Sequence, residues 1–164
     1  MIVVRMKPAR ISTAVAALCL SVSLAGCSSG VDVPVPDPAP VGAAAYACAA
    51  MRGKLPDEVV NQTVVASHPT SDLTSAWGNP PITLRCGVAR PPELRPTSEL
   101  VRIDGVDWFA QKLTHGYVFT TVGRDLNVEV TVPDSYAPEA NALADLSPCI
   151  ALTIPASTSP TPSG

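Results

Sequence analysis

The sequence predicts a small α+β domain, in which an antiparallel sheet of about five strands is flanked by an N-terminal and a C-terminal helix. Residues 43–52, AAAYACAAMR, are rich in strong helix formers. Short runs with a period of two follow them, as expected of half-buried strands. Pro138 then stands at a suitable first turn for a helix over residues 139–146. Strands grouped between two helices, rather than alternating with them, favour an antiparallel sheet with the helices on one face.

Two strands show the clearest alternation of apolar and polar side chains, at residues 82–88 and 126–132. Prolines follow each of them and end the pairing, because proline cannot donate to a ladder. Asp104-Gly105 between two apolar runs is a strong hairpin signal, and His115-Gly116 marks a second turn. The remaining strands are expected at 59–66, 100–103, 106–109 and 117–122, with a loop over 67–74.

The N-terminal residues have the features of an export signal. Three basic side chains precede an apolar stretch of 14 residues, 11–24, too short for a membrane span that needs about 20. Leu24-Ala25-Gly26-Cys27 then matches the bacterial lipoprotein signal, in which the cysteine sulfur receives a diacylglyceryl group. We therefore expect residues 1–26 to be a lipoprotein signal peptide and Cys27 to be lipidated, with fatty acids such as palmitate. An ordinary secretory signal with a chance cysteine is the alternative.

Cleavage of this signal would leave an acidic protein. Residues 1–26 hold three of the 11 Lys and Arg, so 8 basic side chains remain against 14 Asp and Glu and the net charge is −6. Such a protein is not attracted to nucleic acid or to anionic headgroups, so the lipid must anchor it. Residues 27–42 are interpreted as the lipidated cysteine and a proline-rich linker, which lifts the domain on the order of 40 Å from the bilayer. Residues 43–154 form the domain, and residues 155–164 a disordered tail.

Arginines and tryptophans are the candidate ligand contacts. Arg85, Arg90 and Arg124 would bind an anionic ligand if the fold made them converge, and otherwise pair with carboxylates on a solvated sheet face. Trp77 and Trp108 would stack on a sugar or peptide if they were exposed. In a domain with so few aromatics they fit the core or a sheet edge better.

Several segments occur in the order found in a known family. AWGNPP, LRCGVARPP, GVDWF, FTTVGR, VEVTVP and SYAPEANALADLS span most of residues 46–149. With these segments the chain resembles the DUF3515 family, predicted lipoproteins of actinobacteria whose function is unknown. The resemblance implies a small extracytoplasmic domain and supplies no activity, substrate or catalytic residue.

The cysteines are interpreted with this resemblance. The family has one cysteine in its first helix and one in its RCGV strand, which correspond to Cys48 and Cys86, and no counterpart of Cys149. We predict a Cys48–Cys86 disulfide and a free Cys149, because Cys86 lies on the apolar face of the strand that the first helix would cover. The alanines around Cys48 would let the helix approach the sheet closely enough for such a bond. Pairing of Cys86 with Cys149 is the alternative.

Two classes of function remain. The sequence contains no nucleophile elbow, phosphate loop, zinc helix or Cys-x-x-Cys motif, and its histidines lack ligand spacing, so neither a cofactor nor a metal is expected. The first class is a non-catalytic binding or accessory module, lipid-anchored on the outer face of the cytoplasmic membrane, with an envelope protein or glycan as its partner. The alternative is a small envelope hydrolase or transferase. A deep cleft that collects Asp107, Arg124 and a histidine would favour the enzyme, and a shallow face with an exposed tryptophan would favour the binding module.

Overall fold

The computed structural model describes residues 30–158. It contains the α-helices α1 (Ala43–Arg52) and α2 (Ala140–Thr153) and the short 3-10 helix η1 (Asp134–Tyr136). The strands are β1 (Val31–Asp32), β2 (Glu58–Val59), β3 (Gln62–Val65), β4 (Ser67–His68), β5 (Thr74–Trp77), β6 (Ile82–Val88), β7 (Val101–Ile103), β8 (Val106–Leu113), β9 (Gly116–Val122) and β10 (Asn127–Val132).

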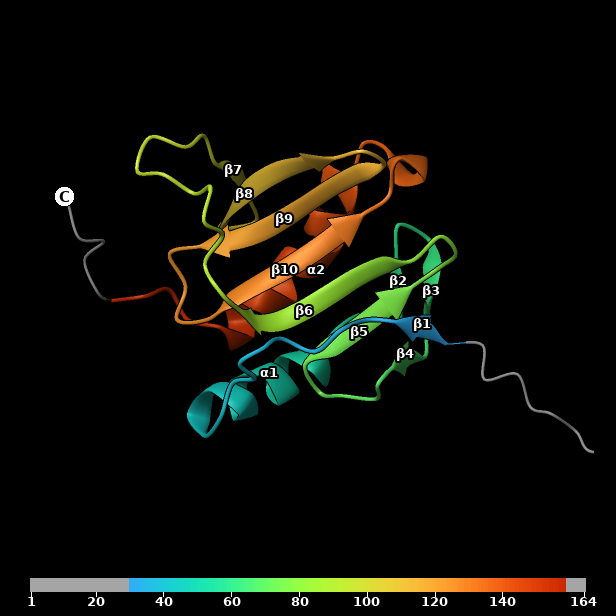
Figure 1. Cartoon of the computed structure of the whole chain (residues 1–164), viewed down its shortest axis with the longest axis horizontal. Helices are drawn as coiled ribbons and strands as arrows, with labels where there is room; N and C mark the ends of the chain where they lie inside the picture. The colour runs from blue at the N-terminus through green and yellow to red at the C-terminus, as the bar shows by residue number, and fades with distance from the viewer. Residues whose placement is uncertain (1–29, 159–164) are drawn as a thin grey trace, which may run out of the picture.

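One antiparallel sheet organises these elements. Its eight strands run in the order β2-β3-β5-β6-β10-β9-β8-β7, while β1 and β4 form a separate parallel pair. In the view of Figure 1, α2 lies behind the sheet and α1 lies below β5 and β6, and the face toward the viewer carries no helix. The α+β class predicted from the sequence is confirmed, with a wider sheet than the five strands or so expected.

The additional strands come from turns that the sequence signals poorly. The segment expected as one strand, 59–66, is divided by a tight turn at Val60 and Asn61, whose φ angles are 50° and 58°. A β-branched residue in the left-handed region is unfavourable, so Val60 gives no sign of a turn. The Asp104-Gly105 turn, by contrast, is present as predicted and joins β7 directly to β8.

Packing against the sheet also extends α2. The helix continues through Pro148 to Thr153, beyond the predicted end at residue 146. A proline inside a helix removes a hydrogen bond and costs about 3 kcal/mol. Leu146 and Ile150 on either side of it are fully buried, and their burial offsets that cost.

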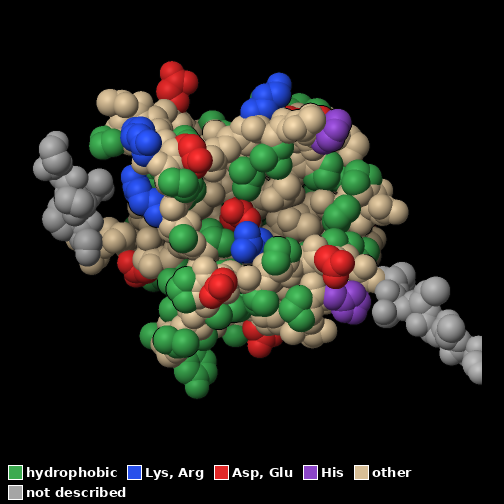
Figure 2. Space-filling view, viewed as in Figure 1, with side chains coloured by type: hydrophobic (Ala, Val, Ile, Leu, Met, Phe, Trp, Pro, Cys, Tyr) green, Lys and Arg blue, Asp and Glu red, His purple; other side chains and the backbone are tan. Residues whose placement is uncertain are grey.

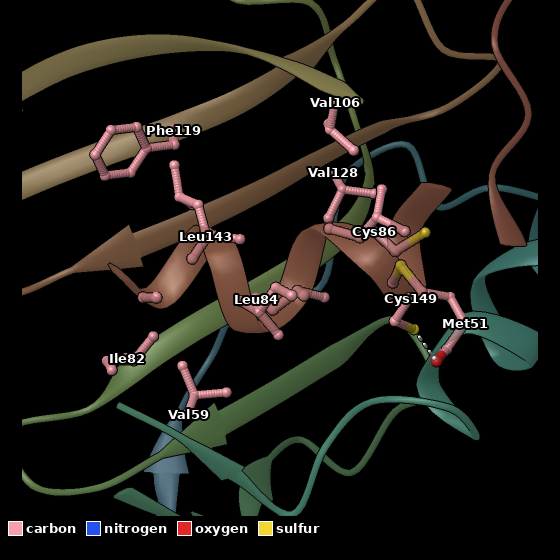
Figure 3. Close-up of a cluster of buried hydrophobic side chains, with 14 of the residues drawn as sticks. Met51, Val59, Ile82, Leu84, Cys86, Val106, Phe119, Val128, Leu143 and Cys149 are labelled. Carbon is pink, nitrogen blue, oxygen red and sulfur yellow. Dashed lines mark hydrogen bonds between the residues drawn. The ribbon is translucent and has the colours of Figure 1, made fainter. Parts of the chain in front are cut away.

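The core lies between the helices and one face of the sheet. Alternate residues of β6 and β10, such as Leu84 and Val128, are buried there beneath Leu143 of α2 (Figure 3). Trp77 and Trp108 belong to the same core, each 0% exposed. Because strand side chains alternate, the residues between these positions point to the helix-free face, which we call the open face.

The cysteines link α1 to this core. A disulfide joins Cys48 of α1 to Cys86 of β6, with Cα atoms 5.7 Å apart. Cys149 of α2 is free and buried, and its thiol donates to the carbonyl oxygen of Met51 at 3.4 Å (Figure 3). Of the two pairings considered from the sequence, the structure therefore has Cys48 with Cys86.

The proline-rich segment before α1 lies against the open face (Figure 1). We call residues 31–40 the N-terminal strap. The amides of Val31 and Val33 donate to Ala66 and His68 at 2.8 and 2.9 Å, and the Val33 side chain is 1% exposed. Residues 31–40 therefore belong to the folded domain, and not to a solvated linker as the sequence suggested.

The first residues of the expected C-terminal tail are also paired. The amide of Asp125 donates to Pro155, and that of Ser157 donates to Gly123. Residues 155–157 thus continue the domain beside the β9–β10 loop, whereas residues 159–164 lie outside the described range. The expected signal peptide and Cys27 lie outside it as well. Between residues 30 and 158, neither helix has the length and apolarity needed to cross a bilayer.

Candidate ligand-binding face

The open face presents a row of side chains from four neighbouring strands. Strand pairing places Arg85 of β6 beside Glu129 of β10, then Thr120 of β9 and Phe109 of β8. Figure 2 views this face, where basic and acidic side chains adjoin near its centre within a hollow. Apart from the buried Thr120, these residues are half-buried, so the face is accessible while its side chains are held in place.

Arg85 connects the sheet to the strap. Its Nε donates to the carbonyl oxygen of Pro34 at 2.8 Å, and one terminal nitrogen donates to Glu129 at 3.0 Å. The two charged side chains are 26% and 22% exposed, so solvent screens their attraction only in part. Arg85 therefore fixes the strap as one wall of the open face.

An open cavity of about 270 Å³ lies where the strap meets the end of β6 and the loop that follows it. Its lining combines charged groups with prolines, namely Pro36, Asp37, Arg85, Val88, Ala89, Arg90, Pro91, Pro92, Glu93, Gln111 and Glu129. Gln111 donates to Glu93 at 3.0 Å across the cavity, and Arg90 donates to the carbonyl oxygen of Leu94 at 3.3 Å. The cavity thus offers guanidinium donors, carboxylate acceptors and rigid apolar rings to a polar ligand.

Arg124 does not join this site, so the three arginines do not converge on one ligand position. Its two terminal nitrogens donate to the carbonyl oxygens of Ile154 and Gly105 at 2.7 and 2.8 Å. These bonds connect the end of α2 to the β7–β8 turn. Only Arg85 and Arg90 of the predicted arginines line the cavity.

The tryptophans are core residues and cannot stack on a ligand. The indole nitrogen of Trp77 donates to the carbonyl oxygen of Pro56 at 3.0 Å, and that of Trp108 donates to the Ser147 hydroxyl at 3.1 Å. Both rings are fully buried. The interpretation of Trp77 and Trp108 as core residues is therefore confirmed, and neither ring can contact a ligand. The exposed tryptophan that would have favoured a binding module is not present, because both rings are buried.

The residues required by the enzymatic alternative are not gathered into one cleft. Asp107 pairs with Arg102, whose Nε and terminal nitrogen donate to the two carboxylate oxygens at 2.7 and 2.8 Å. This hydrogen bonding lowers the pKa of Asp107. His115 follows the far end of β8. At about 3.3 Å per residue, it lies about 26 Å along the strand from Asp107. His68 belongs to β4, beside the opposite part of the sheet. Within residues 30–158, no group of three or more His, Cys, Asp or Glu is arranged to hold a metal ion.

Sequence patterns gave only part of the cavity lining. Gln111 and Glu129 lie on the polar side of alternating strands, but which strands adjoin them depends on the register. Pro36 and Asp37 were assigned to a linker and became part of the site only because the strap packs on the sheet. The alternation of Val31, Val33 and Val35 was the one available signal for that packing.

These features define a small disulfide-bonded α+β domain whose helix-free face offers a candidate binding site. The chain belongs to the DUF3515 family, described as a protein of unknown function, whose model matches residues 10–159. The matched range includes the strap as well as the sheet and both helices. No curated protein and no solved structure matches the chain.

Proposed function

We propose that this protein is a lipid-anchored, non-catalytic binding module of the cell envelope, displayed on the outer face of the cytoplasmic membrane. Its partner is an envelope protein or a glycan that contacts the open face. The observation that carries the proposal is the cavity beside the strap, where charged side chains and prolines surround an accessible volume of about 270 Å³.

The chemistry of this cavity fits a polar partner. The guanidinium of Arg90 is exposed and can donate to carboxylates, carbonyls or hydroxyls. Asp37 and Glu93 supply acceptors for hydroxyl and amide groups. Pro36, Pro91 and neighbouring rings lose little conformational entropy on binding, because proline side chains have few rotamers to lose. A sugar chain or an extended peptide presents matching donors and acceptors.

The anchoring part of the proposal rests on the sequence Leu24-Ala25-Gly26-Cys27. Two or three acyl chains suffice to hold a protein on a membrane, at about 0.8 kcal/mol per buried CH₂. Cys27→Ala should abolish the incorporation of labelled fatty acid. A mutant that still incorporates the label would contradict lipidation at Cys27.

The binding part is tested by site-specific photo-crosslinking in intact cells. A photoreactive amino acid replaces Ala89, which is exposed at the cavity, in one variant. In a matched control it replaces Ala144, which is exposed on α2 behind the sheet. Digestion of the adducts with a protease or with a glycan hydrolase then separates protein partners from glycans.

We expect a discrete adduct from the Ala89 position that is absent from the Ala144 position. Arg90→Ala in the Ala89 variant should weaken that adduct, because it removes the exposed donor beside it. Equal adducts from both positions, or none from Ala89 while the protein remains lipidated, would overturn a binding role for this face.

A further inference from the structure

The strap determines how far the domain can stand from the membrane. We propose that the domain lies directly on the bilayer surface, with the side that carries β1 and β4 facing the lipid headgroups. This inference rests on the lipidation of Cys27 proposed above, and it replaces the 40 Å spacer expected from the sequence with a short tether.

The chain is fixed to the domain from its first described residues. Val31 pairs with Ser67 and Asp32 pairs with His68 in the β1–β4 ladder. Farther along, Arg85 holds the carbonyl of Pro34, and Pro40 packs against Gly87, where an added Cβ would come within 2.6 Å of its ring. Contacts therefore occur along the length of the strap, so it cannot extend as a spacer while they hold.

The remaining tether is short. Only Ser28 and Ser29 separate Cys27 from Gly30. Three Cα–Cα steps of about 3.8 Å span at most about 11 Å, whatever conformation they adopt. A lipid on Cys27 thus keeps the β1–β4 side of the domain within about 11 Å of the headgroups.

The two sides of the sheet should then differ in their distance from the membrane. β4 contacts β5, whereas β7 forms the far edge, five strand spacings from β5. At about 4.8 Å per spacing, that edge lies about 24 Å away. In Figure 1 the strap enters at β1 on the side opposite the loop that leads to β7. Thr70 follows β4 and Thr97 precedes β7, and both are exposed.

This placement deepens the proposed function, because it limits the partners that the cavity can reach. A site held beside the bilayer meets lipid-linked glycans and the membrane-proximal parts of envelope proteins. It does not reach components that lie tens of ångströms from the membrane.

The test compares the depth of two labelled positions in the lipidated, full-length protein. Thr70→Cys and Thr97→Cys, each in a Cys149→Ala background, are labelled with an environment-insensitive fluorophore. Each protein is reconstituted into vesicles of phosphatidylethanolamine and phosphatidylglycerol that contain a lipid with a nitroxide on its headgroup. We expect the label at position 70 to lose most of its fluorescence and the label at position 97 to lose little.

An insertion variant provides the matched control. A flexible glycine-serine segment placed between Ser29 and Gly30 lengthens the tether and leaves every strap contact intact. Quenching at position 70 should fall sharply in this variant. Equal quenching at positions 70 and 97, or quenching that the insertion leaves unchanged, would overturn the placement. Failure to incorporate labelled fatty acid would instead refute the lipid anchor itself, and this is measured separately on the same samples.

Discussion

Arg85 and Pro34 are 51 residues apart in the chain, and a hydrogen bond of 2.8 Å from the guanidinium to the carbonyl joins them on the open face. The same guanidinium pairs with Glu129, so one side chain connects the strap, β6 and β10. This arrangement makes the proline-rich segment a wall of the candidate site.

Gly87→Ala should displace the strap. Gly87 has a φ of 86°, and an added Cβ would lie 2.6 Å from Cγ of Pro40. Gly123 has a similar φ of 70° but nothing within 4 Å of its added Cβ, so Gly123→Ala is the matched control. Both substitutions should cost about 1–2 kcal/mol through the left-handed backbone. Only Gly87→Ala should also make residues 31–40 sensitive to limited proteolysis, and equal proteolysis of the two variants would contradict the contact.

Ser147→Ala should destabilise the core through Trp108. Both side chains are 0% exposed, and the indole N–H donates to the serine hydroxyl at 3.1 Å. Removal of the acceptor leaves a buried donor unpaired, which costs about 1–3 kcal/mol. In a Trp108→Phe background the same change should cost much less, because no donor remains. Urea denaturation of the four proteins measures this coupling, and strictly additive losses would show that the bond contributes nothing.

The Cys48–Cys86 disulfide should contribute strongly to stability. It closes a loop with a sequence separation of 38, for which the chain-entropy model gives about 4 kcal/mol. Simultaneous replacement of both cysteines by alanine should therefore lower the urea midpoint markedly. Cys149→Ala should leave the bond and its sensitivity to reductant unchanged. Peptide mapping under non-reducing conditions decides the pairing, and a peptide that links Cys86 to Cys149 would refute it.

Asp107 should make stability depend on acid pH. The hydrogen bond from Arg102 lowers its pKa below the ordinary 3.8 in the folded state. A carboxyl with a lowered folded pKa stabilises the protein above the unfolded pKa, and this stabilisation is lost as the pH falls through the folded pKa. Asp107→Asn should thus be less stable than the parent protein at neutral pH, with a difference that begins to shrink as the pH falls below 3.8 and vanishes only below the lowered folded pKa. Arg102→Gln should show the same pH dependence of stability. A stability difference that stays constant with pH would contradict the lowering of the Asp107 pKa by Arg102.

The fold class followed from local patterns that tertiary structure did not override. Strand alternation and the Asp104-Gly105 turn predicted the antiparallel sheet, and the scarcity of aromatics favoured buried tryptophans. Three thiols alone allow three pairings, and the alanines around Cys48 and the apolar strand face that carries Cys86 favoured the pairing that the structure has.

The site was harder to predict because its contacts are made by backbone atoms and by distant segments. Arg124 binds two carbonyl oxygens, and no pattern of side-chain types reveals such partners. Prolines at alternate positions favour an extended segment whether it is solvated or packed. The solvated and the packed segment can be distinguished only from the sheet, where Arg85 and Gly87 contact the strap.

We infer that the N-terminal strap is part of the folded domain, where it forms a wall of the candidate site. Amide hydrogen exchange at Val31 and Val33 tests it most directly, because both amides donate to β4 and its neighbour Ala66. We predict protection at these two amides comparable with that of an edge strand of the main sheet. Exchange as fast as that of an unstructured peptide, with Val128 and Val130 still protected, would contradict the claim.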